Sequence, residues 1–332
     1  MIPISTNPWL GLVAPTSPTA ISARRVDPAC PWHLFWAIDH EERCLLVLQH
    51  LAASAPHEKL PVLREIEIRL EALPGGQPVL VLRLLDAKLR DVFHQLCLDI
   101  VAATTGCANE AAAVTAAVAR AWRWHHLLRG GGAGRLRPEE QKGLLGELLV
   151  LERYMLPAFG AAGAVAAWRG PVGAAKDFVS GTVAVESKAR SSNAESVMIS
   201  SEIQLAGDDD EQLFLHLCSI DPANPGDEGA YTLTDVAKRV REGVAAGGSV
   251  VQGRYDALLA AAGFDFADDY SDHPWQGGER SVYRVAGTFP RLTPDTMPPA
   301  VHSVHYALSL NEVGPFMVAP NELQLALIGS VQ

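Results

Sequence analysis

The strongest constraint on the fold of this 332-residue chain is a short β-like run, residues 183–189, that carries Glu186 and Lys188 two positions apart. Side chains alternate between the two faces of a β-strand. Glu186 and Lys188 therefore project from one face, while Val185 and Ser187 project from the other. The run predicts a strand that carries an acid and an amine side by side.

A second acid lies directly upstream of this strand. Residues 177–179 form a short β-like segment that begins with Asp177, and the turn Ser180-Gly181-Thr182 can fold it back as a hairpin. Asp177 and Glu186 can then meet across the strand pair. Mg²⁺ usually takes only one or two carboxylates and keeps several waters, so the two acids predict a site for Mg²⁺ or Mn²⁺. Lys188 would add a positive charge beside a scissile phosphate.

A third acid, Glu147, lies in a predicted helix. Residues 141–152 carry apolar side chains at helical spacing, and Pro138 followed by two acids is typical of a first helical turn. Glu147 lies beside the apolar stripe, where a carboxylate is costly unless it is paired or bound to a metal. We expect it to face the same site as an accessory acid.

The order of a helical Glu, an Asp and a Glu-x-Lys strand resembles the PD-(D/E)XK nuclease superfamily, which has the restriction-endonuclease-like fold. Four strings also resemble a bacterial family assigned to that superfamily, over about residues 30–325: residues 143–152, Trp168-Arg169-Gly170-Pro171, Asp177-Phe178 and Phe289-Pro290-Arg291-Leu292. The sequence departs from the superfamily pattern twice. Lys176 stands where the name has proline, and Ser187 stands where a β-branched apolar residue is more usual.

The resemblance implies a role for each residue. In the superfamily the acids bind Mg²⁺ and the lysine assists the attacking water. Carried over, Asp177 and Glu186 are the metal ligands, Lys188 assists catalysis and Glu147 is an accessory acid. The implied activity is that of a Mg²⁺-dependent DNA endonuclease in restriction or phage defence.

Two alternatives remain open. Nuclease folds are reused without cleavage, so the chain can be a catalytically silent protein that binds DNA or a partner enzyme. A hydrolase of RNA is the second alternative. The intact acid and lysine positions favour an enzyme, because a purely structural sheet has little reason to bury them.

The net charge of −11 argues against a generic nucleic-acid coat, but the charge is unevenly distributed. Residues 120–190 contain eleven Lys or Arg and six Asp or Glu, which gives +5 and leaves −16 for the rest. A basic zone around an acidic metal site fits a phosphate backbone. We expect DNA contacts from five cations in this zone: Arg135, Arg137, Arg169, Lys176 and Arg190. The alternative is a solvated, Arg-rich helical face.

The overall pattern predicts an α/β (α+β) fold with a central mixed sheet flanked by helices. We divide the chain into an irregular N-terminal arm (1–30), an α+β module that ends in a long helix (31–129), the nuclease-like core (130–226) and a C-terminal α+β extension (227–332). In the module we expect strands at 34–38, 44–48, 66–70 and 79–84 and helices at 91–103 and 110–128. In the extension, predicted helices at 234–244 and 255–262 can form a DNA reader, a lid or a dimer surface.

The glycine-rich run 130–134 lacks the Lys-Ser/Thr ending of a phosphate loop and is interpreted as a hinge. The Trp, Arg and His cluster at 122–129 can contact nucleic acid or pack within the protein. The cysteines are scattered without a C-x-x-C pair, which predicts buried free thiols and neither a zinc ribbon nor disulfides: Cys30, Cys44, Cys97, Cys107 and Cys218.

The chain has no uninterrupted apolar run of the ~18–20 residues that a membrane span needs. Its N-terminus has neither the basic segment nor the apolar segment of a signal peptide. We therefore expect a cytoplasmic protein without membrane contact. Its expected partners are DNA and either a second copy in a homodimer or other restriction or defence proteins.

Overall fold

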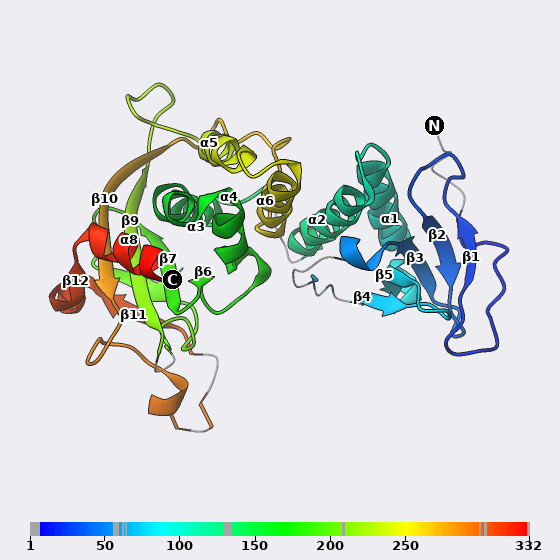
Figure 1. The fold of residues 1–332 in the computed structure, drawn as a ribbon, viewed down its shortest axis with the longest axis horizontal. Coiled ribbons are helices and arrows are strands. Elements are labelled where there is room, and N and C mark those ends of the chain that lie inside the picture. Colours follow the sequence, from blue (N-terminus) through cyan, green and yellow to red (C-terminus); the bar gives the residue numbers. More distant parts are fainter. Residues whose placement is uncertain are drawn as a thin grey trace. The chain divides into compact units, whose positions relative to one another are not determined.

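A computed structural model shows the fold in Figure 1. It describes residues 7–55, 60–61, 63, 65–128, 135–207, 210–298, 300–301 and 304–330. The chain forms two compact units, Met1–Gly134 and Arg135–Gln332. The predicted hinge at residues 130–134 lies outside the described residues.

The N-terminal unit contains a five-stranded antiparallel sheet and two helices that pack against each other. The strand order is β1-β2-β3-β5-β4. The elements are β1 (Ser22–Arg25), β2 (Leu34–Ile38), β3 (Cys44–Gln49), β4 (Ile66–Ala72), β5 (Pro78–Leu84), α1 (Arg90–Thr105) and α2 (Glu110–Leu128). The four predicted strands and both predicted helices of this region are present.

Strand β1 corrects the sequence prediction, because it lies within the segment expected to be irregular. It pairs with β2 in antiparallel register, with Arg25 opposite Phe35. The end of α2 also has a structural role. Trp122 is buried, and the Trp124 indole Nε1 donates to Asp99 Oδ2 at 3.1 Å. These contacts favour packing over base contact for the aromatic residues of this cluster.

The C-terminal unit is built on a second five-stranded sheet, which is mixed as predicted. Its order is β12-β10-β9-β7-β6, and only the β7–β9 pair is parallel. The strands are β6 (Phe178–Ser180), β7 (Val183–Arg190), β9 (Gln212–Pro222), β10 (Trp275–Arg284) and β12 (Met317–Val318). Strand β10 lies within this sheet, between β12 and β9, so the predicted boundary at residue 226 does not separate two cores.

The long helices of this unit pack their buried side chains against one face of the sheet, together with Val183, Val185 and Phe214. Figure 1 shows α3, α4 and α5 on one side of the strands. The helical elements are α3 (Pro138–Val150), a π-helical turn (Leu151–Met155), α4 (Leu156–Ala167), α5 (Leu233–Ala245), α6 (Ser249–Ala261) and α8 (Pro320–Gly329). The predicted extension helices therefore belong to the core of the unit.

The opposite face of the sheet carries a second apolar layer, which includes Leu213, Leu215 and Leu217 of β9. A two-stranded ladder contributes to this layer: β8 (Ser196–Ile199) and β11 (Tyr306–Ser309), followed by the short helix α7 (Leu310–Val313). The predicted sheet flanked by helices is therefore present on one face only, because the other face is covered largely by this ladder. The reason is that β8 pairs with a strand more than a hundred residues away, which local patterns do not reveal.

The stretch Pro138–Ala167 is long and apolar enough to cross a membrane by length and composition alone. Its apolar side chains, including Leu148 and Leu151, lie in the core of the C-terminal unit. Gly160 has a non-helical backbone with φ of 62°, so the stretch is two helices joined at a kink. A buried core helix accounts for the composition. Four of the five cysteines are buried and all are free, as predicted.

Candidate metal centre

The predicted hairpin is formed by β6 and β7, with Phe178 opposite Val185 and Ser180 opposite Val183. Asp177 immediately precedes β6, which places it across from Glu186. Strand β6 begins at Phe178, so among the described residues no strand pairs with β7 beyond Val185 on that side. The Asp177 Oδ2 atom instead accepts a hydrogen bond from the Ser187 backbone N–H at 2.8 Å. The Asp177 carboxylate is thereby fixed at the edge of β7.

A turn before β6 holds Asp177 from the other side. The backbone N–H groups of Arg169 and Gly170 both donate to the Asp177 carbonyl, at 2.7 and 3.0 Å. A Cβ atom added at Gly170 would lie 2.5 Å from Glu147 Oε2 and 2.7 Å from Asp177 Oδ1. Only glycine fits at this position, because the carboxylates of Glu147 and Asp177 both border it.

Glu147 reaches the site from α3. Its Oε2 atom accepts a 2.7 Å hydrogen bond from the Trp168 indole Nε1. Burial raises the pKa of Glu147 well above its ordinary value, and the charges of Asp177 and Glu186 raise it further, against the opposing effects of Trp168 and Lys188. Glu147 therefore faces the other two acids and is not a surface charge.

Glu186 lies at the buried side of the cluster and is only 1% exposed. Lys188 Nζ lies 2.9 Å from Glu186 Oε1 and donates to Gln204 Oε1 at 3.1 Å. The same Gln204 oxygen accepts from the Ser200 backbone N–H at 2.8 Å. The ammonium group is therefore held between a carboxylate and an amide. Sequence reasoning missed Gln204, Trp168 and Gly170 as site residues, because each acts through a contact made only in the folded chain.

Burial raises the pKa of all three acids, and the charge of a neighbouring acid adds to the shift of Glu147 and of Glu186. Burial raises the pKa of Glu186 to about 8, with the Asp177 charge adding to the shift and Lys188 opposing it. Burial raises the pKa of Asp177 to about 6, against the Ser187 N–H and Lys188. One ammonium group does not compensate three clustered carboxylates, so a bound cation would relieve the remaining repulsion.

The uncompensated negative charge of these acids suits a hard divalent cation. Within the described part of the chain, neither Glu186 carboxylate oxygen accepts a well-aligned hydrogen bond, although Lys188 lies close. The described residues contain no preformed group of three His, Cys, Asp or Glu ligands. Asp177 and Glu186 thus provide the two carboxylates that Mg²⁺ commonly accepts, and the remaining positions suit water or phosphate oxygen.

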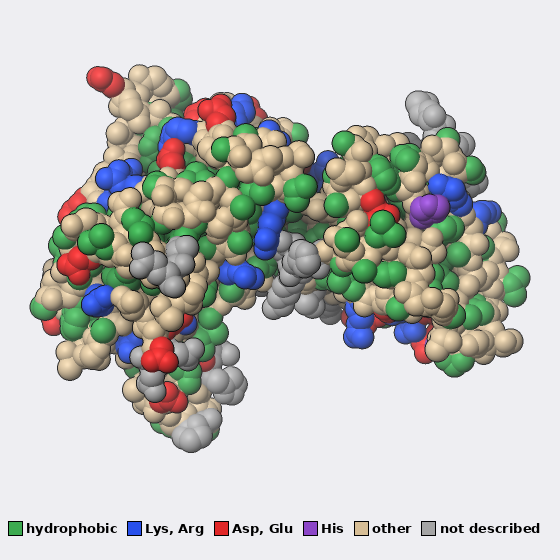
Figure 2. All heavy atoms as spheres, viewed as in Figure 1, with side chains coloured by type: hydrophobic (Ala, Val, Ile, Leu, Met, Phe, Trp, Pro, Cys, Tyr) green, Lys and Arg blue, Asp and Glu red, His purple; other side chains and the backbone are tan. Residues whose placement is uncertain are grey.

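The five cations that were predicted to contact DNA differ in whether an acid pairs with them. Four of them form ion pairs with acids: Arg135 with Asp272 (2.8 Å), Arg137 with Glu140 (2.7 Å), Lys176 with Glu211 (3.0 Å) and Arg190 with Glu279 (3.5 Å). Arg169 is exposed, belongs to the turn that holds Asp177, and has no acidic partner among the residues described. Figure 2 shows Lys and Arg as separate spots on the visible face of this unit, without a continuous basic stripe.

Comparison with known proteins bears on the same residues. Residues 5–311 match the profile of a family described as "Putative PD-(D/E)XK family member". No curated protein and no solved structure matches the chain significantly. The matched range contains Glu147, Asp177, Glu186 and Lys188, and it confirms the resemblance drawn from the sequence. The chain therefore belongs to this family, DUF4420, whose PD-(D/E)XK assignment implies a restriction-endonuclease-like fold.

Proposed function

We propose that the protein is a Mg²⁺-dependent phosphodiester hydrolase that cuts DNA as an endonuclease, in restriction or phage defence. The observation that carries this proposal is the clustering of Glu147, Asp177 and Glu186 at the edge of β7, with Lys188 paired to Glu186. Family membership supports the same activity. The defence context, a cytoplasmic location and assembly as a homodimer or with other defence proteins belong to the proposal as well.

Asp177 and Glu186 would hold Mg²⁺ or Mn²⁺, which when bound supplies a Lewis acid for a phosphoryl oxygen. Lys188 Nζ, oriented by Glu186 and Gln204, places a positive charge beside the reacting phosphate. Glu147 uses Oε2 for the Trp168 hydrogen bond, which leaves Oε1 to hold a proton. Its raised pKa fits a carboxyl that keeps its proton where an ordinary glutamate would be ionised.

The direct test is incubation of the purified chain with supercoiled plasmid at low salt, with Mg²⁺, with Mn²⁺ and with EDTA. We expect nicked or linear DNA only in the presence of a divalent ion. A Lys188→Ala variant purified in parallel serves as the control for a contaminating nuclease. Equal cutting by parent and variant would place the activity elsewhere.

Arg169 is the predicted DNA contact that the structure leaves available. We expect Arg169→Gln to weaken binding of a short duplex by about 3- to 10-fold and to lower the slope of log K against log salt by about 1, because one phosphate contact is lost. The measurement is fluorescence anisotropy at several salt concentrations in Ca²⁺. The matched control is Arg137→Gln, since Arg137 is ion-paired with Glu140. An equal effect of both substitutions would contradict a specific contact at Arg169.

One observation favours the catalytically silent alternative, in which the fold serves to bind a partner. Residues 135–332 contain 15 Lys or Arg and 26 Asp or Glu, so the whole net charge of −11 resides in the unit that holds the site. Such a charge opposes non-specific DNA binding. If the parent neither cuts nor binds DNA or RNA at low salt with Mg²⁺ or Mn²⁺, this alternative becomes the better account.

A further inference from the structure

The string Phe289-Pro290-Arg291-Leu292 supplies neither an acid nor the lysine of the metal centre. Phe289 is buried in the apolar layer that includes Leu213, Leu215 and Leu217, and its ring lies 5.1 Å from that of Phe316 between centroids. The Leu292 N–H donates to the Tyr306 hydroxyl of β11 at 3.4 Å. The string is therefore fixed on both sides of Arg291.

Arg291 contacts a loop that leads to the metal centre. Its Nη1 atom donates to the Leu205 carbonyl at 2.7 Å. The Leu205 side chain is fully buried in the same apolar layer as Phe289. A hydrogen bond with a charged donor is shorter and stronger than one between neutral groups. The contact therefore fixes the backbone of Leu205, which follows Gln204 in the sequence.

The loop at residues 200–205 depends on such contacts for its shape. It is a turn without helix or strand. Its own hydrogen bond from the Gln204 N–H to the Ser201 carbonyl is at the long end of the usual range, at 3.2 Å. A second contact from outside the loop is made by the Val304 N–H, which donates to Glu202 Oε2 at 2.9 Å.

The loop bears on the metal centre through Gln204. The Gln204 Oε1 atom accepts from Lys188 Nζ at 3.1 Å and from the Ser200 N–H at 2.8 Å. Among the described residues, the Lys188 ammonium has one other close partner, Glu186 Oε1 at 2.9 Å. A shift of the loop would leave Glu186 alone to orient the ammonium. Misplacement of a catalytic group by about 1 Å can slow a reaction about 10²-fold.

We propose that Arg291 is a positioning residue of the metal centre, which holds the 200–205 loop so that Gln204 fixes the Lys188 ammonium. The effect on cleavage rests on the proposed nuclease function, whereas the effect on Lys188 does not. Arg291 acts through the loop and not on the substrate. Its loss should therefore slow the chemical step and leave DNA affinity unchanged.

The first test observes Lys188 directly and needs no nuclease activity. The chain has six lysines, so a ¹⁵N-lysine-labelled sample gives a simple NMR spectrum of ammonium groups, in which Lys188→Arg identifies the Lys188 signal. The spectra are recorded in EDTA at slightly acidic pH, where ammonium protons exchange slowly with water. We expect Gln204→Ala and Arg291→Ala to shift or broaden this signal in the same way. Arg291→Lys keeps a donor for the Leu205 carbonyl and should return the signal towards that of the parent.

The second test separates positioning from DNA contact. We expect Arg291→Ala to lower the single-turnover rate of duplex cleavage about 10- to 100-fold, and Arg291→Lys to restore part of that rate. The duplex Kd in Ca²⁺ should stay within about twofold of the parent value, with an unchanged salt dependence.

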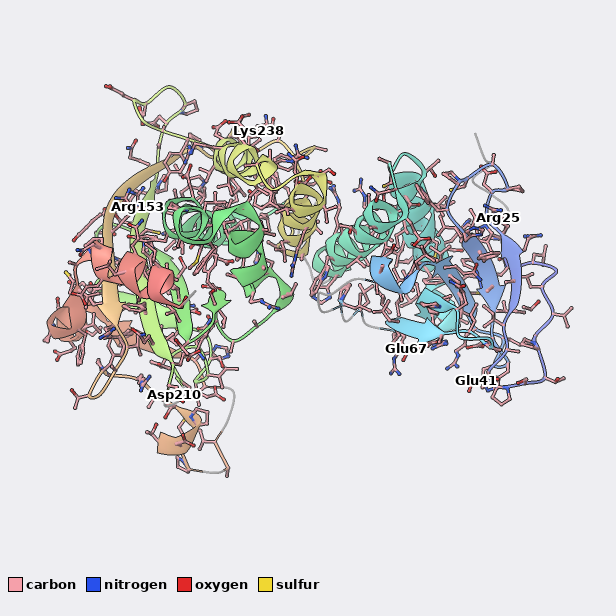
Figure 3. All side chains as sticks on the ribbon, viewed as in Figure 1. Arg25, Glu41, Glu67, Arg153, Asp210 and Lys238 are labelled. Atoms are coloured by element: carbon pink, nitrogen blue, oxygen red, sulfur yellow. The ribbon has the colours of Figure 1, made fainter. Side chains whose placement is uncertain are left out.

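The matched control is Arg25→Ala. Arg25 is also half-buried and donates to a backbone carbonyl, that of Cys30, at 2.8 Å. Figure 3 labels Arg25 in the N-terminal unit. This variant should keep both the Lys188 signal and the cleavage rate of the parent.

Three results would overturn the proposal. The first is a Lys188 signal that neither Gln204→Ala nor Arg291→Ala changes, or that only Gln204→Ala changes. The second is an Arg291→Ala variant that binds the duplex more weakly and has a salt slope lower by about 1, because Arg291 would then be a phosphate contact. The third is an equal change of the Lys188 signal in Arg25→Ala. A parent that cuts no DNA would contradict the nuclease function, and the Lys188 signal would still decide the role of Arg291.

Discussion

Asp177→Asn and Glu186→Gln are each expected to lower Mg²⁺-dependent DNA cleavage by about 10³-fold or more. Both substitutions keep the shape of the side chain and remove one of the two negative oxygen ligands that the site offers. The buried position of Glu186 means that no nearby surface acid can replace it. The measurement is single-turnover cleavage of a labelled duplex with excess enzyme over a range of Mg²⁺ concentrations.

Binding of the duplex should respond in the opposite direction. In EDTA both variants are expected to bind DNA as tightly as the parent or more tightly, because a carboxylate that repels phosphate has been removed. Lys188→Ala should also stop turnover, but it should weaken binding because a cation near the phosphate is lost. This split between cleavage and binding separates a metal ligand from a residue that only contacts the substrate.

The matched control for these variants is Glu152→Gln. Glu152 lies on the π-helical turn that continues α3, and it is ion-paired with Arg239 away from the metal centre. The Glu152→Gln substitution should leave both DNA cleavage and DNA binding unchanged. If the Asp177 and Glu186 variants cut as fast as the parent does, catalysis does not occur at the candidate metal centre.

The arrangement of the site could be predicted where it depends on local geometry. The hairpin β6–β7 follows from strand alternation and a short turn, so its placing of Asp177 opposite Glu186 needed no knowledge of the rest of the chain. That the Glu147 side chain faces the site could be predicted because Glu147 lies beside an apolar stripe of its helix. These are interactions between residues close in sequence or constrained by a single element.

The charge pattern could not be predicted in the same way. Arg135 is ion-paired with Asp272, 137 positions away in the sequence, and Lys176 is ion-paired with Glu211 on a distant loop. A count of Lys and Arg along the chain therefore overestimates the positive charge available to DNA. Gln204 could not be predicted either, because its contact with Lys188 forms only in the folded chain and a single glutamine is not part of any motif.

In the absence of metal, Glu186→Gln is expected to be more stable than the parent at pH 8.5, by at least about 4 °C in Tm. The folded-state pKa of Glu186 is about 8, against an ordinary value of 4.5. A raised pKa means that the folded protein loses stability as pH rises from about 4.5 to about 8, and that the full loss persists above pH 8. Each pKa unit corresponds to about 1.4 kcal/mol, and glutamine imitates the neutral acid at every pH.

The advantage of the variant should therefore shrink at pH 5.5, where Glu186 of the parent carries its proton. In the variant, Lys188 loses its ion pair with Glu186. It keeps the hydrogen bond to Gln204, and its side chain remains 15% exposed to water. We therefore expect the loss of the ion pair to cost little stability. Added Mg²⁺ should raise the Tm of the parent at pH 8.5 and leave the variant almost unchanged.

Thermal unfolding in EDTA and in Mg²⁺ at both pH values measures all of these differences. Glu211→Gln is the matched control, because Glu211 is a half-buried acid of the same unit that is ion-paired with Lys176. That variant should be less stable than the parent at both pH values, since a compensated charge pair is broken. A parent that is more stable than Glu186→Gln at pH 8.5 without metal would show that Lys188 fully compensates Glu186. The cluster would then be a structural ion pair with no need of a cation.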